Sequence, residues 1–261
     1  MAFIRSFLIG SFALAALSFG VGLASEPLLL QSPTVSRTQI AFVYGGDLWV
    51  VGRGGGAAHR LIAGVGLAGS PVFSPDGSTI AFSANNDGNA DVYVVPAAGG
   101  EPKRLTYDPS GDVVTGWTND GSRVVFRSGR DSGTDAVQLY TIPASGGLAT
   151  MLPLPDAQGG SYSADGTRFA YVPNSQWEPY WRGYRGGQTT PIWIANLADS
   201  SVDRVLAGND NNRNPMWIGN RVYYLSDRDG SFTLYAYDLQ TRASTRLIEN
   251  HRGLDIVSAS A

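Results

Sequence analysis

A β-propeller of four-stranded antiparallel blades is the fold class that this sequence of 261 residues predicts, with five complete blades and the start of a sixth. Three observations predict it: a repeat of about 40 to 50 residues, two strand columns that keep their phase through five copies, and turn signals at fixed places in each copy. A sheet with two apolar faces needs a neighbour on each side, which explains why the unit repeats.

The first column is the second strand of each unit, and it ends in an aromatic residue. Its copies lie at 40–42, 80–82, 124–126, 169–171 and 222–224. The aromatic residues at 42, 82, 126, 171 and 224 are therefore 40, 44, 45 and 53 residues apart. The second column is the third strand, with copies at 47–50, 91–94, 138–141, 191–194 and 233–236. We expect the aromatic residues to fill the space between neighbouring blades.

Turn residues define the remaining anatomy of the unit. Ser74-Pro75-Asp76-Gly77 precedes a second strand, where proline sets φ and glycine accepts a positive φ. Residues 118–121 and 163–166 repeat this turn without the proline. A short fourth strand follows at 60–61, 104–106, 204–206 and 246–247. We expect blades at residues 33–63, 70–108, 113–153, 159–207 and 213–249, and a partial sixth blade at 250–261.

The first 25 residues differ from the rest of the chain. Arg5 precedes an uncharged apolar run at 7–24 that ends in small residues, the pattern of a secretory signal peptide. This pattern predicts a signal peptide at 1–25, the propeller at 26–261, and an exported protein, periplasmic or extracellular in preference to cytoplasmic. The alternative is an uncleaved membrane anchor, since the run is long enough to span a thin bilayer. No other membrane contact is expected.

Composition excludes several classes of function. The net charge is −3 with mixed signs along the chain, so no nucleic-acid partner is expected. The chain has no cysteine, which excludes disulfides, thiolate metal sites and cysteine nucleophiles. Only 16% of residues are charged, while glycine (33) and proline (14) are frequent, as many short strands and tight turns require.

Residues that could support catalysis are few. A nucleophilic serine needs a nearby base, and only His59 and His251 are available, both in turns or links. Residues 130–133, which include Ser132, superficially resemble a serine-protease nucleophile segment, but they occupy the loop between second and third strands. We therefore interpret them as a turn and expect no catalytic residue in this chain.

Two further patterns are weak. Residues 64–69 match the glycine fingerprint of dinucleotide sites by letter, but a strand follows them instead of a helix, so no cofactor is expected. The asparagine- and aspartate-rich stretches 85–89 and 209–212 lack the ligand spacing and terminal glutamate of a calcium loop. Turns capped by their own side chains explain them better, and no metal is expected.

An insertion at 174–190 is the best candidate for a role beyond the blades. It concentrates aromatic and arginine side chains that could contact a peptide or a partner through stacking and carboxylate pairing. The candidate binding residues are Trp177, Trp181, Arg182, Tyr184 and Arg185. The favoured alternative is that the insertion packs on a neighbouring blade, domain or subunit.

Several segments resemble a known family. Residues 71–77, 91–94 and 99–102 look like the WD-like repeats of TolB-type and tricorn-type proteins. Residues 40–51 resemble the first blade of the tricorn peptidase family, and Trp-Arg-Gly-Tyr-Arg-Gly-Gly at 181–187 is similar to that family's Trp-Lys-Arg-Tyr-Arg-Gly-Gly element. Residues 225–230, Leu-Ser-Asp-Arg-Asp-Gly, are also typical of it. Gly183 departs from the family at a basic position.

The resemblance implies the N-terminal six-bladed propeller of a larger, homo-oligomeric serine peptidase. In that family a second propeller, a PDZ-like domain and catalytic domains follow, and the propellers serve as scaffold and peptide gate. The implied partners are peptides and other domains or subunits of the same peptidase. None of the family's catalytic residues has a counterpart in this chain.

Two other readings remain open. A TolB-like periplasmic propeller that docks partner proteins fits the signal peptide, but the insertion and the wording of the fifth unit fit it poorly. A propeller that is itself an enzyme would need polar groups that converge on its axis. We see no cluster of histidine, carboxylate and metal-ligand residues that recurs at such positions.

Overall fold

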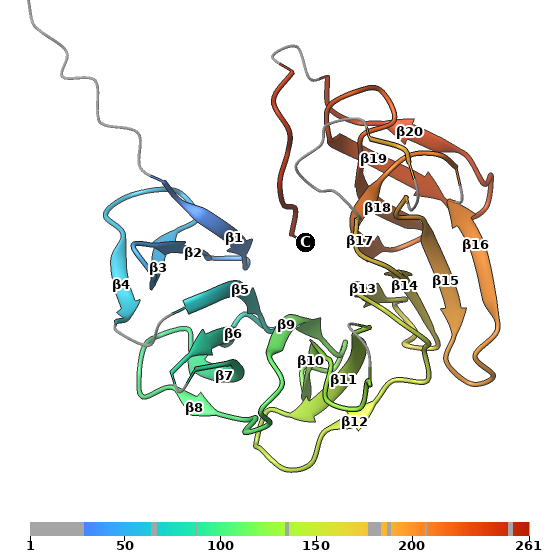
Figure 1. Cartoon of the computed structure of the whole chain (residues 1–261). Coiled ribbons are helices and arrows are strands. Elements are labelled where there is room, and N and C mark those ends of the chain that lie inside the picture. Colours follow the sequence, from blue (N-terminus) through green and yellow to red (C-terminus); the bar gives the residue numbers. More distant parts are fainter. Residues whose placement is uncertain are drawn as a thin grey trace, which may run out of the picture.

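The computed structural model describes residues 29–63, 67–86, 88–133, 136–176, 184–186, 189–206, 208–249 and 253–260. Within these ranges the chain forms five antiparallel sheets of four strands each, and every sheet is one blade (Figure 1). In each blade the strands follow chain order from the axis outward, so the predicted propeller is confirmed. The proposed signal peptide at 1–25 lies outside the described residues.

The bounds of the strands are as follows. Blade 1 contains β1 (Gln31–Val35), β2 (Gln39–Tyr44), β3 (Asp47–Gly52) and β4 (His59–Ile62). Blade 2 contains β5 (Leu67–Phe73), β6 (Thr79–Asn85), β7 (Ala90–Pro96) and β8 (Lys103–Arg104). Blade 3 contains β9 (Asp112–Trp117), β10 (Arg123–Ser128), β11 (Gln138–Pro143) and β12 (Thr150–Met151). Blade 4 contains β13 (Gly159–Tyr162), β14 (Arg168–Val172), β15 (Ile192–Asn196) and β16 (Val202–Leu206). Blade 5 contains β17 (Asn212–Ile218), β18 (Arg221–Ser226), β19 (Thr233–Asp238) and β20 (Ser244–Arg246).

The first strand of each blade lies next to the axis, and four of the five contain an irregularity (Figure 1). In β1, β5, β9 and β17 the pairing with the second strand shifts at Ser32, Ser70, Thr115 and Asn214. Three of these residues have a positive φ, of 48° at Ser32, 62° at Ser70 and 52° at Asn214. A bulge bends a strand and increases its twist. Each of these bends contains a short polar side chain, and the bends of β1, β5 and β17 also contain a proline, Pro33, Pro71 and Pro215.

Four of the five aromatic residues of the column, all except Phe42, lie in buried clusters between neighbouring blades, as predicted. Phe82 and Tyr93 of blade 2 stack with ring centroids 5.6 Å apart and pack on Leu48 and Val50 of blade 1. Leu48, Val50 and Phe82 have no exposed surface, and burial of such a side chain contributes about 2 kcal/mol. The equivalent stacked pairs in later blades are Phe126 with Tyr140 and Tyr224 with Tyr235.

The segment predicted to begin a sixth blade forms no strand over its described part, residues 253–260. It runs between blade 5 and blade 1, where it is hydrogen-bonded to both (Figure 1). The Ile256 amide donates to the Phe232 carbonyl at 3.0 Å, and the Ser260 and Thr34 hydroxyls lie 3.3 Å apart. The segment therefore bridges the two ends of the arc of blades.

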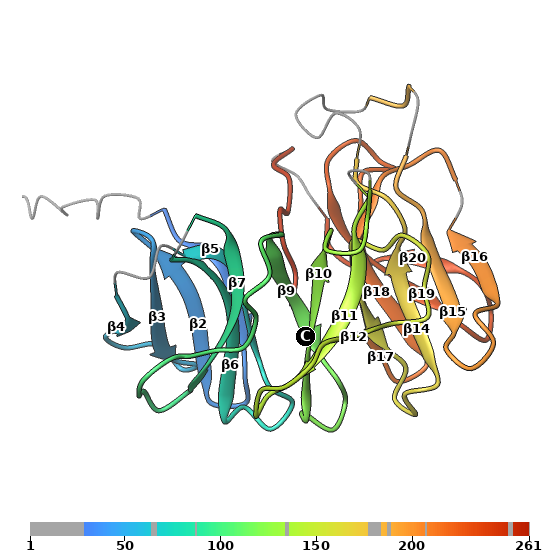
Figure 2. The ribbon, with the colours of Figure 1, turned by 60° about the horizontal axis from the view of Figure 1, so that its bottom comes forward.

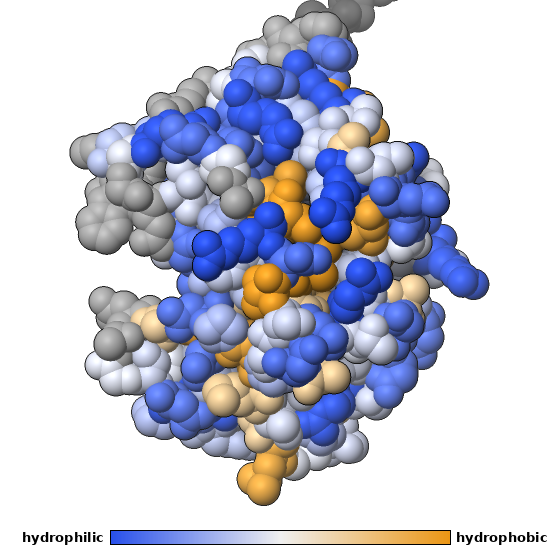
Figure 3. Space-filling view, turned by 90° about the vertical axis from the view of Figure 1, so that its right-hand side faces the viewer, coloured by the Kyte–Doolittle hydropathy of each residue, from blue (hydrophilic) through white to orange (hydrophobic). Residues whose placement is uncertain are grey.

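The strands of every blade run between two rims of loops, as the second view shows (Figure 2). On the side of blades 4 and 5 a band of apolar residues reaches the surface among polar ones (Figure 3). Partly buried Val205, Trp217 and Leu239 pack against the core between these two blades. Among the described residues, no helix is long and apolar enough to cross a membrane.

The predicted turns before the second strands of blades 2, 3 and 4 are confirmed, and all three share one hydrogen-bond pattern. In blade 2 the Gly77 amide donates to the Ser74 carbonyl at 2.8 Å, and Gly77 has a φ of 74°. The Asp76 carboxylate accepts from the Ser74 hydroxyl at 2.5 Å and from the Ser78 amide at 3.0 Å. Hydroxyl and amide donors at the same spacing surround Asp120 and Asp165.

These turns should make the free energy of unfolding decrease at low pH. The hydroxyl two residues before each aspartate, followed by the amide two residues after it, lowers the pKa of Asp76, Asp120 and Asp165 from 3.8 to about 2. A lowered pKa in the folded state stabilises the fold above pH 4, and this stabilisation is lost as the pH falls towards 2. Urea denaturation between pH 5 and pH 2 should show this decline. A variant with asparagine at all three positions should show a shallower decline, and an identical pH dependence would contradict the assignment.

Candidate functional site

Polar side chains gather on one rim of the propeller, where the loops between second and third strands lie. We call this edge the loop rim, and it comprises the described parts of residues 45–46, 86–89, 129–137, 173–191 and 227–232. Each innermost strand begins at the same rim, because the second strand that pairs with it runs in the opposite direction and ends there. Residues far apart in the sequence are therefore brought together at this rim.

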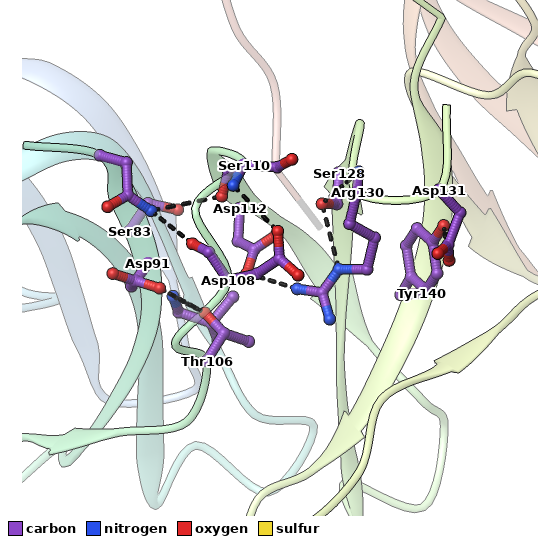
Figure 4. Close-up of polar contacts among 12 residues, drawn as sticks. Ser83, Asp91, Thr106, Asp108, Ser110, Asp112, Ser128, Arg130, Asp131 and Tyr140 are labelled. Carbon is purple, nitrogen blue, oxygen red and sulfur yellow. Dashed lines mark hydrogen bonds and ion pairs between the residues drawn. The ribbon is translucent and has the colours of Figure 1, made fainter. Parts of the chain in front are cut away.

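Blade 3 carries an arginine, Arg130, that lies over two aromatic rings at the loop rim. Figure 4 shows Arg130 with Asp112 and Tyr140. The Arg130 guanidinium lies 5.0 Å from the Phe126 ring centroid and 5.1 Å from that of Tyr140. Its Nη2 forms an ion pair with Asp112 Oδ2 at 2.5 Å, and its Nε donates to Ser128 Oγ at 3.2 Å. Such cation–π contacts together with a buried ion pair fix the arginine in one position.

The tyrosine of this arrangement is bonded to the next residue of the loop. Tyr140 donates its hydroxyl to Asp131 Oδ2 at 2.8 Å (Figure 4). Burial, followed by this hydrogen bond and the negative charge of Asp131, raises the pKa of Tyr140 to about 12. The hydroxyl therefore stays protonated and acts as a donor, not as a base.

Blade 5 repeats the arrangement with the same residue types. The Arg228 guanidinium lies over the rings of Tyr224 and Tyr235, pairs with Asp210 at 3.2 Å and donates to Ser226 Oγ at 3.3 Å. Tyr235 donates its hydroxyl to Asp229, as Tyr140 does to Asp131. From the sequence, both loops are expected to be turns only. A sequence pattern that indicates Arg130 and Arg228 is Ser-x-Arg-Asp, which occurs at 128–131 and 226–229, at the end of a second strand.

Blade 2 adds a third arginine–carboxylate pair near Asp112 (Figure 4). Asp91 is fully buried, pairs with Arg104 at 2.6 Å and accepts from the Thr106 hydroxyl at 3.0 Å. Burial raises the pKa of Asp91, although Thr106 and Arg104 act in the opposite direction. Each of these carboxylates has an arginine partner, so the cluster resembles a structural network more than a catalytic pair.

The candidate binding residues of the insertion divide into two groups. Trp177, Trp181 and Arg182 lie outside the described residues. Tyr184 and Arg185 are described, and both are half-buried. Arg185 forms a two-pronged ion pair with Asp227 of blade 5, with distances of 2.8 Å and 2.9 Å. At this residue the insertion packs on the neighbouring blade.

The residues considered for catalysis and metal binding do not form a centre within the described part of the chain. His59 is exposed on β4, the outer strand of blade 1, and His251 lies outside the described residues. Ser132 lies in a turn, since its amide donates to the Gly129 carbonyl at 2.9 Å. Among the described residues, no three histidine, aspartate or glutamate side chains form a group that could bind a metal ion. Asn85 caps its own turn, because its Oδ1 accepts from the Gly88 amide at 2.9 Å.

The blade architecture and the repeated turns define a propeller domain with WD-like blades. Residues 27–261 match the model of the tricorn protease N-terminal β-propeller domain, and the chain belongs to that family. The tricorn protease homolog 1 of Streptomyces coelicolor is 33% identical over 96 residues, which are 36% of this chain and 9% of that protein. The tricorn protease of Thermoplasma acidophilum is 33% identical over 61 residues, which are 23% of this chain and 6% of that protein.

Solved structures agree with this assignment. The crystal structure of the tricorn protease has a TM-score of 0.76 and 26% identity, over 86% of this chain and 23% of that one. A putative TolB from Agrobacterium tumefaciens has a TM-score of 0.70 and 21% identity, over 85% of this chain and 81% of that one, which shows a common fold alone. The matched region covers less than a tenth of each curated relative described above.

Proposed function

We propose that this chain is the scaffold and peptide gate of a tricorn-type serine peptidase, and that domains outside residues 1–261 carry out the proteolysis. The observation that carries the proposal is the match of residues 27–261 to the N-terminal propeller of tricorn proteases.

The strands next to the axis support a passage for an extended peptide. Their bends carry short side chains, at Ser32, Ser70, Thr115 and Asn214. Asn214 and Gln31 are exposed on these strands, so polar groups are available to an extended chain. Because such groups bond to any peptide backbone, they suit passage without strong selection for sequence.

Obstruction of the axis tests the gate. We would replace Gln31 by cysteine in the full-length protein, with any cysteines elsewhere changed to serine, and attach a bulky maleimide. We expect the label to lower kcat/KM for a long peptide and to leave hydrolysis of a dipeptide amide reporter unchanged. The matched control is Leu148→Cys, since Leu148 is 89% exposed in the turn between β11 and β12, away from the axis.

Three results would contradict the proposal. Equal turnover of both substrates with and without the Gln31 label would exclude a gate at the axis. The same loss with the Leu148 label would show that the effect is not specific to the axis. A full-length protein that binds partner proteins and hydrolyses no peptide would instead favour the TolB-like docking function.

The proposal includes export of the protein from the cytoplasm and a set of binding partners. The charge and apolar run of residues 1–24 support export, and N-terminal sequencing of the native protein would establish whether cleavage occurs near residue 25. The proposed partners are peptides and other domains or subunits of the same peptidase, with Trp177, Trp181, Arg182 and Tyr184 as candidate contacts.

A further inference from the structure

We infer that Arg185 is a positioning residue, and that Asp227 is present in blade 5 to receive it. The Arg185–Asp227 pair connects residues 184–186 of the blade 4 insertion to the loop rim of blade 5 and holds them there. This inference assigns Arg185 a partner within the chain, and it stands whether or not the domain gates peptides.

The geometry of the pair is that of a strong, specific contact. Arg185 Nη1 lies 2.8 Å from Asp227 Oδ2, and Nη2 lies 2.9 Å from Oδ1. Nη2 also donates to the Asp227 carbonyl at 3.3 Å. The Asp227 side chain is 3% exposed and that of Arg185 is 25% exposed, so solvent screens the pair little. Two parallel hydrogen bonds from a planar guanidinium define both distance and orientation, which a lysine cannot do.

The remaining partners of Asp227 are neutral. Oδ1 accepts from the Asn211 amide at 2.8 Å, and Oδ2 accepts from Asn211 Nδ2 at 3.0 Å. A buried carboxylate is costly unless its charge is compensated, and Arg185 is the cation that pairs with it. The two residues therefore depend on each other.

Blade 3 forms the same arginine and tyrosine contacts without a carboxylate at the position of Asp227. The serine, the arginine and the second aspartate make the same contacts in two blades. The two segments are Ser128-Gly129-Arg130-Asp131 in blade 3 and Ser226-Asp227-Arg228-Asp229 in blade 5. The remaining position is glycine in blade 3 and Asp227 in blade 5. Blade 2, which precedes blade 3, has only residues 86–89 between its second and third strands. The carboxylate is thus found where the preceding blade carries an insertion.

Both ends of the insertion are bonded as well. Asn174 Nδ2 donates to the Thr189 carbonyl at 2.9 Å and closes the base of the insertion. Asn212 of β17 donates its amide to Thr190 Oγ1 at 2.8 Å and its Nδ2 to the Thr190 carbonyl at 3.1 Å. Arg185 supplies a contact point between these ends, so its loss should free residues 184–186 while Asn174 and Thr190 stay in place.

Protease accessibility tests the inference. We would replace Asp227 by glycine, the residue that blade 3 has at this position, and measure chymotryptic cleavage after Tyr184 in the full-length protein by mass spectrometry. We expect cleavage to become about tenfold faster. Without the ion pair, local opening of the chain around Tyr184 costs less free energy and exposes the cleavage site more often. Cleavage after Tyr107, which is 73% exposed between blades 2 and 3, is the internal reference and should not change.

Two further variants make the test specific. Arg185→Lys keeps the charge and loses the two-pronged contact, so it should give an intermediate rate. The double variant Asp227→Gly/Arg185→Ala should cleave no faster than either single variant, because both remove one interaction.

The inference is overturned if cleavage after Tyr184 is unchanged in Asp227→Gly and Arg185→Ala. Additive effects in the double variant would also overturn it, since the two residues would then act separately. A rise in cleavage that extends equally to Tyr107 would show a general loss of stability instead of a local release. Asn211→Ala removes the side-chain bond from Asn211 Nδ2 to Asp227 and keeps the backbone bond, and a rate equal to that of Asp227→Gly would assign the effect to the Asn211 side chain.

Discussion

Gly160→Ala is expected to lower the free energy of unfolding by about 3 kcal/mol or more, as strong overpacking of a core site does. Gly160 lies in β13, opposite Tyr171 of β14. A Cβ at this position would collide with the backbone carbonyl of Ala170 and lie 2.6 Å from Cε1 of Phe169, a fully buried ring. Because the carbonyl belongs to the backbone of the neighbouring strand, relief requires a shift of the strand pair. Urea denaturation measures the loss directly.

Two neighbouring glycines provide matched controls for this variant. A Cβ at Gly159 would lie 3.6 Å from Thr115 Cγ2, and one at Gly116 would lie 4.0 Å from the Gly160 carbonyl, both ordinary contacts. We expect Gly159→Ala and Gly116→Ala to change stability by less than about 1 kcal/mol. Similar stability of all three variants would contradict the close approach of β13 and β14 at Gly160.

Arg130→Ala should destabilise the fold by about 3 to 5 kcal/mol, the usual cost of leaving a buried charge without its partner. Asp112 has no exposed side-chain surface, and its Oδ1 has no hydrogen-bond partner, so Arg130 supplies the compensation for its charge. The substitution also removes the cation–π contacts of Arg130 with the rings of Phe126 and Tyr140. Chemical denaturation at neutral pH checks the result.

The repeated motif in blade 5 supplies the control. Arg228 contacts the same residue types as Arg130, but its partner Asp210 is 18% exposed and the pair is longer, at 3.2 Å. Solvent can compensate the charge of Asp210 in part, so we expect Arg228→Ala to cost about 1 kcal/mol. Addition of Asp112→Asn to Arg130→Ala should restore part of the lost stability by removal of the buried charge. Equal losses for Arg130→Ala and Arg228→Ala would show that burial of Asp112 is not the cause.

Three of the predictions test separate parts of the structure. They concern the acid dependence of the turns, the gate at the axis and the Arg185–Asp227 pair. The turns act within one blade, the pair acts between two blades, and the gate concerns the axis that all blades surround. Failure of one of these predictions leaves the other two intact.

The blade repeat was predictable from the sequence because its causes are local. Alternating apolar residues, the aromatic residue at the end of each second strand and the Asp-Gly turns depend on neighbours within a few residues. The exception is the fourth strand of blade 3, β12, which has two residues and lacks the arginine–apolar pair of the other fourth strands. Its pairing with β11 depends on position in the sheet and not on a local signal.

The polar site was decided by the tertiary structure. Arg130 and Asp112 are 18 residues apart and belong to one blade, but they meet only because β9 and β10 run in opposite directions and share the loop rim. Arg185 and Asp227 are 42 residues apart and belong to different blades. No short-range pattern predicts such a pair, and the sequence alone therefore indicates Arg185 as a binding residue and not as the partner of Asp227.

The sequence by itself thus determined the class of fold, the order of strands and the family. The fold and the strand order rest on short patterns that recur from blade to blade, and the family rests on short segments such as residues 181–187 and 225–230. Only the tertiary structure decided which charged side chains form ion pairs. It also decided that Gly160 has no room for a side chain, because the backbone of the neighbouring strand lies too close. The physical reason is that these properties depend on distances between strands and blades, which the twist of each sheet and the packing of aromatic rings establish.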